Sequence, residues 1–240
     1  MVELYSKVHL NFGQKILKTP MGLKKFSTTE QICAHLQLKE NGQQSLSQNK
    51  INKKFVYLIS PSKIRDKNFY TNLAFLLDSG KVSYFQLRLK KETNSKKLII
   101  GKKIKKICKK YKVKFLINDD PLLAKKLNAD GCHLGQKDMD LTKARKILKN
   151  KIIGVTCHNS IDLAKTAIKA GADYLAFGAF YASKTKIVKY KASLKILKSI
   201  KKITSLPIVA IGGIKFNNYK KLLLNKANFL AISGYIWNNK

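Results

Sequence analysis

The sequence predicts a (β/α)8 barrel of the TIM type, preceded by a poorly structured N-terminal extension. Eight short, β-prone apolar runs follow one another from Phe55 onward, and longer lysine-rich segments of helical character separate them. A strand–helix unit repeated eight times is typical of a closed parallel barrel, which occupies ~200–250 residues. A doubly wound open sheet is the alternative. It usually has fewer strands and a glycine-rich turn after the first, whereas Ser60-Pro61-Ser62-Lys63 stands at that point.

The apolar runs are the candidate strands. They span residues 55–60, 82–88, 114–118, 131–135, 152–157, 174–178, 207–213 and 229–233. The segments between them, such as 95–111 and 160–171, are predicted to be helices. In the second of these, Ile161, Ala164 and Ile168 recur at helical spacing, and Gly171 provides a C-terminal stop.

Residues 1–54 differ from the rest of the chain. The stretch 39–53 has no aromatic residue and only two aliphatic ones, so it is predicted to be a linker, and a short helix is possible near 28–38. We therefore divide the chain into an extension or linker, residues 1–54, and a barrel domain, residues 55–240.

Composition limits the classes of partner. The net charge is +36, from 49 Lys+Arg against 13 Asp+Glu, yet only three of the cations are arginine. Arginine is the residue suited to bidentate phosphate and base contacts, and the lysines are spread over most of the chain. We interpret them as solvated helix faces and expect no specific nucleic-acid partner, although a basic nucleic-acid-binding protein remains an alternative.

The cysteines and the termini suggest a cytoplasmic setting. The four cysteines form no Cys-x-x-Cys pair, and the dipeptides Cys132-His133 and Cys157-His158 lack the paired spacing of a structural zinc site. We expect both cysteines to be core residues. No signal-peptide core and no apolar stretch of ~18 residues occurs, so no membrane association is predicted.

Polar residues gather where the predicted strands end, the position at which a barrel builds its active face. The second run ends in Gln86-Leu87-Arg88-Leu89-Lys90. Strand alternation points Gln86, Arg88 and Lys90 to one side. Cationic and amide groups at a barrel mouth suit an anionic ligand.

Aspartate is scarce but locally concentrated. Five of the nine aspartates lie within residues 119–140, namely Asp119, Asp120, Asp130, Asp138 and Asp140. Asp120 before Pro121 and Asp140 before Leu141 have the pattern of helix N-caps. Asp119 and Asp138 follow neighbouring strands, and we predict that they hold Mg2+, which takes one or two carboxylates plus phosphate oxygens and water.

Small residues follow the last two strands. Gly212-Gly213 and Ser233-Gly234 would let backbone N–H groups approach a phosphate, which many barrels bind at this place. The barrel mouth therefore has room for two phosphorylated small molecules or one bisphosphate.

Taken together, these motifs resemble the thiamine phosphate synthase family from about residue 55 to 237. The resemblance is carried by Gln86-x-Arg88-x-Lys90, Asn118-Asp119, His133-Leu-Gly-Gln-x-Asp138, Gly154-Val-Thr-Cys-His158, Gly171-Ala-Asp-Tyr174, Thr185-Lys186 and Ile211-Gly-Gly-Ile214. The resemblance implies a Mg2+-dependent transferase of thiamine biosynthesis. A pyrimidine methyl diphosphate would alkylate a thiazole phosphate, giving thiamine phosphate and diphosphate.

The resemblance also implies roles for individual residues. Asp119 and Asp138 would hold Mg2+ on the diphosphate, and Arg88 and Lys186 would be catalytic. The pyrimidine diphosphate would be bound by Gln86, Arg88, Lys90, Asn118, Thr156 and Lys186. The thiazole phosphate would be bound by Ser183, Thr185, Gly213, Ser233 and Gly234.

Some positions depart from the family pattern. Ala179 and Ala182 stand where proline is common, Ser183 replaces a threonine, and Leu89 replaces an acidic residue. A sister enzyme without synthase activity, such as a thiazole tautomerase, and another phosphosugar barrel enzyme are therefore the alternatives within this fold. A homo-oligomer is compatible with the sequence.

Overall fold

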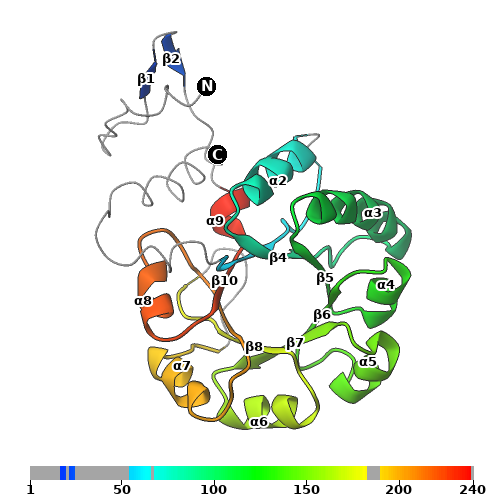
Figure 1. The fold of residues 1–240 in the computed structure, drawn as a ribbon, viewed down its shortest axis with the longest axis vertical. Helices are drawn as coiled ribbons and strands as arrows, with labels where there is room; N and C mark the ends of the chain where they lie inside the picture. Colours follow the sequence, from blue (N-terminus) through cyan, green and yellow to red (C-terminus); the bar gives the residue numbers. More distant parts are fainter. Residues whose placement is uncertain (1–16, 20–21, 25–53, 66–67, 183–189, 239–240) are drawn as a thin grey trace.

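Eight parallel strands close into a barrel in the computed structural model, which describes residues 17–19, 22–24, 54–65, 68–182 and 190–238 (Figure 1). The strands are β3 (Val56–Ile59), β4 (Val82–Leu87), β5 (Lys114–Asn118), β6 (Gly131–Leu134), β7 (Ile152–His158), β8 (Tyr174–Gly178), β9 (Ile208–Ile211) and β10 (Phe229–Ile232). Each strand pairs with its neighbours in sequence, and β10 pairs with β3 to close the barrel. The predicted fold is confirmed, and every apolar run supplies one strand.

Helices surround the barrel and follow the strands in turn (Figure 1). They are α2 (Phe69–Asp78), α3 (Asn94–Lys110), α4 (Pro121–Lys126), α5 (Leu141–Leu148), α6 (Ile161–Lys169), α7 (Leu194–Lys201), α8 (Tyr219–Leu224) and α9 (Gly234–Trp237). Asp120 caps α4 by accepting from Leu123 N, and Asp140 caps α5 by accepting from Thr142 N and Lys143 N. Both predicted caps are confirmed. In each, a short side chain provides an oxygen that satisfies N–H groups left free by the first helical turn.

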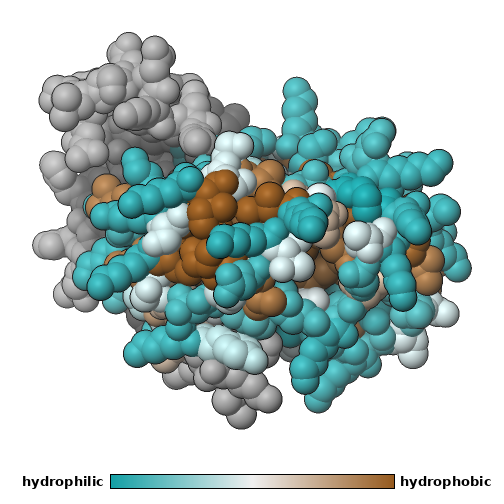
Figure 2. Space-filling view, turned by 90° about the horizontal axis from the view of Figure 1, so that it is seen from below, coloured by the Kyte–Doolittle hydropathy of each residue, from teal (hydrophilic) through white to brown (hydrophobic). Residues whose placement is uncertain are grey.

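Lysines occupy the outer faces of the helices, as the composition suggests. In α3, Lys102, Lys103 and Lys106 are exposed, whereas Ile104 and Cys108 are buried. Figure 2 shows one side of the molecule, where hydrophilic side chains surround a central apolar patch. Cys132 and Cys157 are also fully buried, in agreement with their interpretation as core residues.

Strand alternation divides the apolar side chains into two clusters. Leu58 and Phe85 point outward and pack under the helices, while Tyr57, Leu116 and Tyr174 point into the barrel. The inner cluster is unusual in containing two buried tyrosines, Tyr57 and Tyr174, because barrel interiors are dominated by branched aliphatic side chains.

The N-terminal face, where the strands begin, is held by side chains that bind backbone. Asp130, Asp173 and Asn228 each immediately precede a strand. Their side-chain oxygens accept from Phe115 N at 2.9 Å, Ile153 N at 2.7 Å and Ile208 N at 2.9 Å, respectively. The strands that they tie together are β5 and β6, β7 and β8, and β9 and β10.

Arg145 strengthens the same face. Its guanidinium contacts Asp173 Oδ2 at 2.6 Å and donates to the carbonyl oxygens of Lys149, Lys151 and Gly171. One of the three arginines therefore has a structural role.

Two short strands precede the barrel. β1 (Leu17–Thr19) and β2 (Gly22–Lys24) pair in antiparallel fashion. The linker predicted at 39–53 and the helix predicted near 28–38 lie outside the described residues. Among the residues that the structure does describe, no helix is long and apolar enough to cross a membrane.

Candidate active site

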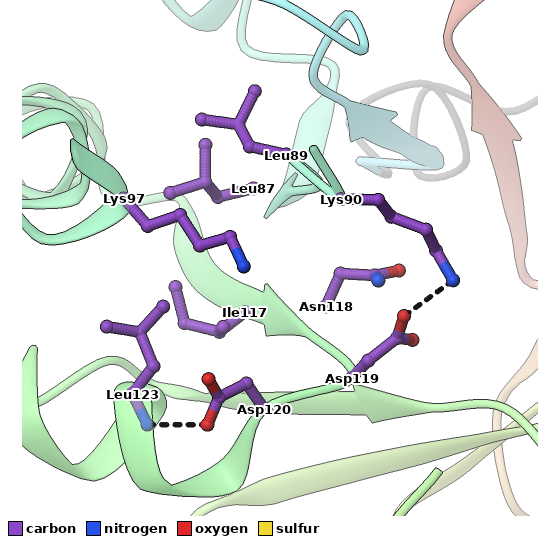
Figure 3. Close-up of a pocket in the computed structure, with 9 residues that line it drawn as sticks. All are labelled: Leu87, Leu89, Lys90, Lys97, Ile117, Asn118, Asp119, Asp120 and Leu123. Atoms are coloured by element: carbon purple, nitrogen blue, oxygen red, sulfur yellow. Dashed lines mark hydrogen bonds and ion pairs between the residues drawn. The ribbon is translucent and has the colours of Figure 1, made fainter. Parts of the chain in front are cut away.

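Two carboxylates meet at the C-terminal face, where the strands end. Asp119 directly follows β5, and Asp138 lies in the loop between β6 and α5; their side chains are hydrogen-bonded to each other. Lys90 Nζ lies 2.7 Å from Asp119 Oδ2 (Figure 3), and Asp138 Oδ2 accepts from Gly135 N at 2.6 Å. The structure thus brings together the two residues predicted to hold a metal ion.

The backbone at Asp119 has an unusual conformation. Its φ is +64°, in the left-handed region that most side chains avoid. The Asp119 N–H donates to His133 O at 2.8 Å, which extends the pairing of β5 with β6 by one residue. This bond fixes the point at which the carboxylate leaves the strand.

The two carboxyl groups differ in proton affinity. Burial raises the pKa of Asp119, but the hydrogen bonds with Lys90 and Asp138 outweigh it and hold that pKa below its ordinary value. Burial and the contact with Asp119 raise the pKa of Asp138. Two close carboxyl groups disfavour each other's ionisation, so Asp138 holds a proton more strongly than Asp119 does.

This donor set suits a hard divalent cation. A cation between them would offset the repulsion of two ionised carboxylates, and oxygen-only donors match Mg2+. Among the described residues, no group of three or more His, Cys, Asp or Glu side chains is arranged to hold a metal. Two carboxylates leave most coordination positions to water and substrate oxygens, as is usual for Mg2+ at phosphate sites.

Arg88 is a half-buried cation at the end of a strand on the same face. It follows β4, and its backbone N–H donates to Ser60 Oγ at 2.9 Å. Its guanidinium forms no ion pair with any described residue, in contrast to that of Arg145. Burial lowers the pKa of His133 at the barrel mouth, and the charge of Arg88 adds to that effect.

Gln86, Asn118 and Thr156 lie on three strands at the same end of the barrel. Gln86 is 2% exposed and donates through Nε2 to Tyr57 OH at 3.0 Å. Thr156 Oγ1 lies 2.8 Å from His133 Nε2, and its carbonyl oxygen accepts from Gln136 Nε2 at 2.5 Å. Asn118 pairs in register with His133. The structure therefore gathers these predicted substrate residues around His133.

A cavity of about 190 Å³ opens beside this cluster (Figure 3). It is lined by Leu87, Leu89, Lys90, Lys97, Ile117, Asn118, Asp119, Asp120 and Leu123. The Lys97 side chain points toward Asn118 across the cavity, a position that strand-end reasoning missed because Lys97 comes from α3. Leu89, one of the departures from the family pattern, is 3% exposed and packs in the outer core.

The ends of β9 and β10 lie side by side on the same face. Gly213 has φ +59°, and a Cβ there would lie 2.2 Å from Ala182 O, so only glycine fits. Ser233 Oγ donates to Ser60 O at 3.1 Å, and Gly234 begins α9. Gly213, Ser233 and Gly234 thus follow the ends of two paired strands, whereas Ser183, Thr185 and Lys186 lie outside the described residues.

Several residues of the site were not predicted. Tyr57, Tyr174 and Gln136 contact the predicted residues or His133. His133 and Tyr174 belong to motifs that carry the family resemblance, but neither was given a role. Alternation along β6 was the signal that could have found His133, because Leu134 packs outward and His133 must then face the interior.

Comparisons with known proteins agree with this geometry. A family model described as thiamine monophosphate synthase matches residues 56–236. The thiamine-phosphate synthase of Pelagibacter ubique (strain HTCC1062) is 85% identical over 195 residues, which cover 81% of this chain and 94% of that protein. The enzyme of the same name from Nitrosomonas eutropha (strain DSM 101675 / C91 / Nm57) is 40% identical over 179 residues, covering 74% and 84%.

Solved structures give the same result. A thiamine phosphate pyrophosphorylase from Pyrococcus furiosus superposes with a TM-score of 0.66 and 29% identity, covering 76% of this chain and 87% of that one. An N-acetylmannosamine-6-phosphate 2-epimerase from Clostridium perfringens has a TM-score of 0.56 at 11% identity, covering 81% and 94%. The second likeness supports the barrel fold alone.

Proposed function

The chain belongs to the thiamine monophosphate synthase family, and from this premise we propose how its barrel mouth carries out the synthase reaction. The activity is that of a thiamine-phosphate synthase, a transferase of thiamine biosynthesis. The ring nitrogen of a thiazole phosphate bonds to the methylene carbon of a (4-amino-2-methylpyrimidinyl)methyl diphosphate, and the bond from that carbon to the diphosphate oxygen breaks. The products are thiamine phosphate and diphosphate.

Asp119 and Asp138 hold Mg2+ in this proposal. The support is the close contact of the two carboxyl groups at the ends of neighbouring strands, which raises the pKa of Asp138. When bound, Mg2+ supplies positive charge to the diphosphate leaving group. Lys90, 2.7 Å from Asp119, adds a further cation beside that position.

Arg88 and Lys186 neutralise the departing diphosphate. Arg88 suits this role because its guanidinium is free of protein carboxylates in the described part of the chain. Arginine also presents a planar fork of donors that matches phosphate oxygens. Lys186 is assigned by its place in the Thr-Lys motif of the loop after β8.

Gln86, Asn118 and Thr156 hold the pyrimidine diphosphate, with Arg88, Lys90 and Lys186 on its phosphates. Ser183, Thr185, Gly213, Ser233 and Gly234 hold the phosphate of the thiazole. The support for the second group is that Gly213 and Ser233 end adjacent strands, where backbone N–H groups can approach an anion.

The chemistry needs alignment and charge more than acid–base groups. The aminopyrimidine stabilises a cationic methylene as the diphosphate leaves, so the protein has to neutralise the leaving group and orient the thiazole nitrogen. The single observation that carries the proposal is the cluster of Asp119, Asp138, Lys90 and Arg88 at one barrel mouth. A thiazole tautomerase needs no diphosphate site of this kind.

The test is a direct assay. Purified protein with both substrates and Mg2+ should form thiamine phosphate, detected after oxidation to its fluorescent thiochrome derivative, and a chelator should abolish the product. Isomerisation of the thiazole without product formation would instead identify a tautomerase. Location in the cytoplasm, the lack of a specific nucleic-acid partner and a homo-oligomeric state remain predictions.

A further inference from the structure

A continuous chain of hydrogen bonds crosses the interior of the barrel. It runs from Gln86 Nε2 to Tyr57 OH at 3.0 Å, to Tyr174 OH at 2.8 Å and to His133 Nδ1 at 2.8 Å. His133 Nε2 then reaches Thr156 Oγ1 at 2.8 Å. Five strands, β4, β3, β8, β6 and β7, contribute one group each, and both ends are residues that we assign to the pyrimidine substrate.

The middle of this chain is sealed from water. Tyr57 is 2% exposed and Tyr174 is 1% exposed, and burial raises the pKa of both hydroxyl groups, so both remain protonated. Buried hydroxyl groups need partners within the protein. Here each tyrosine finds its partners in the chain itself.

Gly154 creates the space for this arrangement. A Cβ at Gly154 would lie 1.8 Å from Cζ of Tyr174, so any larger residue would displace the ring. The ring stacks on His133 with centroids 5.6 Å apart and meets Tyr57 edge-on at 5.8 Å. The Tyr174 hydroxyl is thereby fixed between Tyr57 and His133.

One assignment of donors and acceptors gives every hydroxyl hydrogen within this chain a partner. Gln86 Nε2 can only donate, so the Tyr57 hydroxyl oxygen accepts from it. The Tyr57 hydroxyl then donates its own hydrogen to the Tyr174 hydroxyl oxygen. Tyr174 in turn donates to Nδ1 of the neutral imidazole, whose hydrogen is then on Nε2 and is donated to Thr156 Oγ1. The hydrogen of the Thr156 hydroxyl is left to point elsewhere.

The two ends therefore have opposite polarity. In the described part of the chain no hydrogen bond ends on Gln86 Oε1, a buried acceptor. A buried acceptor without a protein partner needs a donor from outside the chain, which a bound substrate can supply. An amino group can donate to Gln86 Oε1, while the Thr156 hydroxyl can donate to an acceptor on the same substrate.

We propose that Tyr174 is a positioning residue for the synthase reaction, because its hydroxyl fixes Gln86 as an acceptor and Thr156 as a donor toward the aminopyrimidine diphosphate. This inference rests on the proposed function, which places both residues against that substrate. Tyr174 itself touches no substrate in this arrangement. It acts through His133 on one side and through Tyr57 on the other.

The first experiment compares two equivalent substitutions. Tyr174→Phe removes a hydroxyl within the chain, and Tyr84→Phe removes one from the same inner cluster but outside the chain. Calorimetric titration with the pyrimidine diphosphate and Mg2+, without the thiazole, should show ~10-fold weaker binding for Tyr174→Phe and less than ~2-fold change for Tyr84→Phe. KM for the thiazole phosphate should stay unchanged in both.

A double-mutant cycle shows whether Tyr174 acts through Thr156. If it does, Tyr174→Phe combined with Thr156→Val should cost little more than the larger single loss, since both break the same path. Additive losses, or wild-type binding by Tyr174→Phe, would overturn the inference. If Tyr174→Phe does not fold, Tyr57→Phe interrupts the path one step earlier and is judged by the same criteria.

The direction of the bonds can be measured without turnover. Long-range 1H–15N spectra of the histidine rings, with the His133 signals assigned by their loss in His133→Gln, should show the hydrogen on Nε2. A hydrogen on Nδ1 would overturn the stated polarity. Failure of wild-type protein to make thiamine phosphate would count against the proposed function instead, whatever the tautomer.

Discussion

The two faces of the barrel use the same residue types in opposite ways. On the N-terminal face, Asp130 and Asp173 are apart from one another, and each accepts a backbone N–H and has its own cation, Lys114 or Arg145. On the C-terminal face, Asp119 and Asp138 touch each other and share a single cation. A carboxylate whose charge the protein fully satisfies holds the fold, and a pair left short of positive charge is able to take a metal.

The aspartates that cluster within residues 119–140 of the sequence lie on both faces of the barrel. Asp130 lies within the stretch 119–140 but precedes β6, so it falls at the opposite end of the barrel from Asp119 and Asp138. Position before or after the strand separates Asp130 from the pair to which we assign the metal. Asp120 and Asp140 also follow strands, but they cap helices.

The largest effect on turnover should come from a change in the Asp119–Asp138 pair. Asp119→Asn should lower Mg2+-dependent turnover by at least ~10²-fold, because one of two metal ligands is lost, while the melting temperature changes little. Turnover against Mg2+ concentration, together with thermal melts, measures both. Asp130→Asn is the matched control on the other face, and an equal loss of turnover there would contradict the distinction between the faces.

The two arginines should separate rate from stability. Arg88→Ala should reduce kcat by ~10²-fold and leave the fold intact, because its guanidinium is assigned to the leaving group. Arg145→Ala should lower the free energy of unfolding by about 2 kcal/mol, through loss of charged hydrogen bonds, with kcat unchanged in the folded protein. Denaturant titration and steady-state kinetics of both variants test this, and the reverse pattern would refute it.

Mg2+ affinity should depend on pH. The pKa of Asp138 is raised by burial and by Asp119, so below that pKa a proton competes with the cation. The Mg2+ concentration for half-maximal activity should therefore rise as pH falls, by at most about tenfold per pH unit for one displaced proton. A Mg2+ requirement that stays constant across this range would show that Asp138 is ionised without the metal.

The smallest effect is expected on the N-terminal face. Asp173→Asn keeps an acceptor for Ile153 N but loses the charge beside Arg145, so unfolding should become easier by about 1 kcal/mol. Chemical denaturation detects such a change if the slope of the transition is constant. A change in Mg2+ affinity in Asp173→Asn would show that the two faces are coupled, and would contradict their separation into a structural face and a metal-binding face.

The sequence was sufficient for the fold because each barrel strand is buried on both sides. Such strands appear as short continuous apolar runs, and residues 152–157 and 174–178 became β7 and β8 almost without change. Asp120 and Asp140 were also recognisable as caps, since capping is a local interaction.

Parts of the site depend on contacts that no local pattern contains. Tyr57 and Tyr174 meet across 117 positions of sequence, and only barrel closure brings them together. Gly154 belongs to one of the family motifs, but only the structure shows that it leaves space for the ring of Tyr174. The roles assigned to Lys186, Ser183 and Thr185 stay predictions from the family resemblance.

The side-chain ties of the N-terminal face connect neighbouring strands independently of the loops that link them in sequence. Asp130, Asp173 and Asn228 join β5 to β6, β7 to β8 and β9 to β10. Lys151 joins β7 to β6 by donating to Asn128 Oδ1 and Ala129 O. Because these ties run both within and between successive strand–helix units, a circular permutation that opens the chain near residue 150 should leave the ties at the other strands in place and preserve the closed barrel.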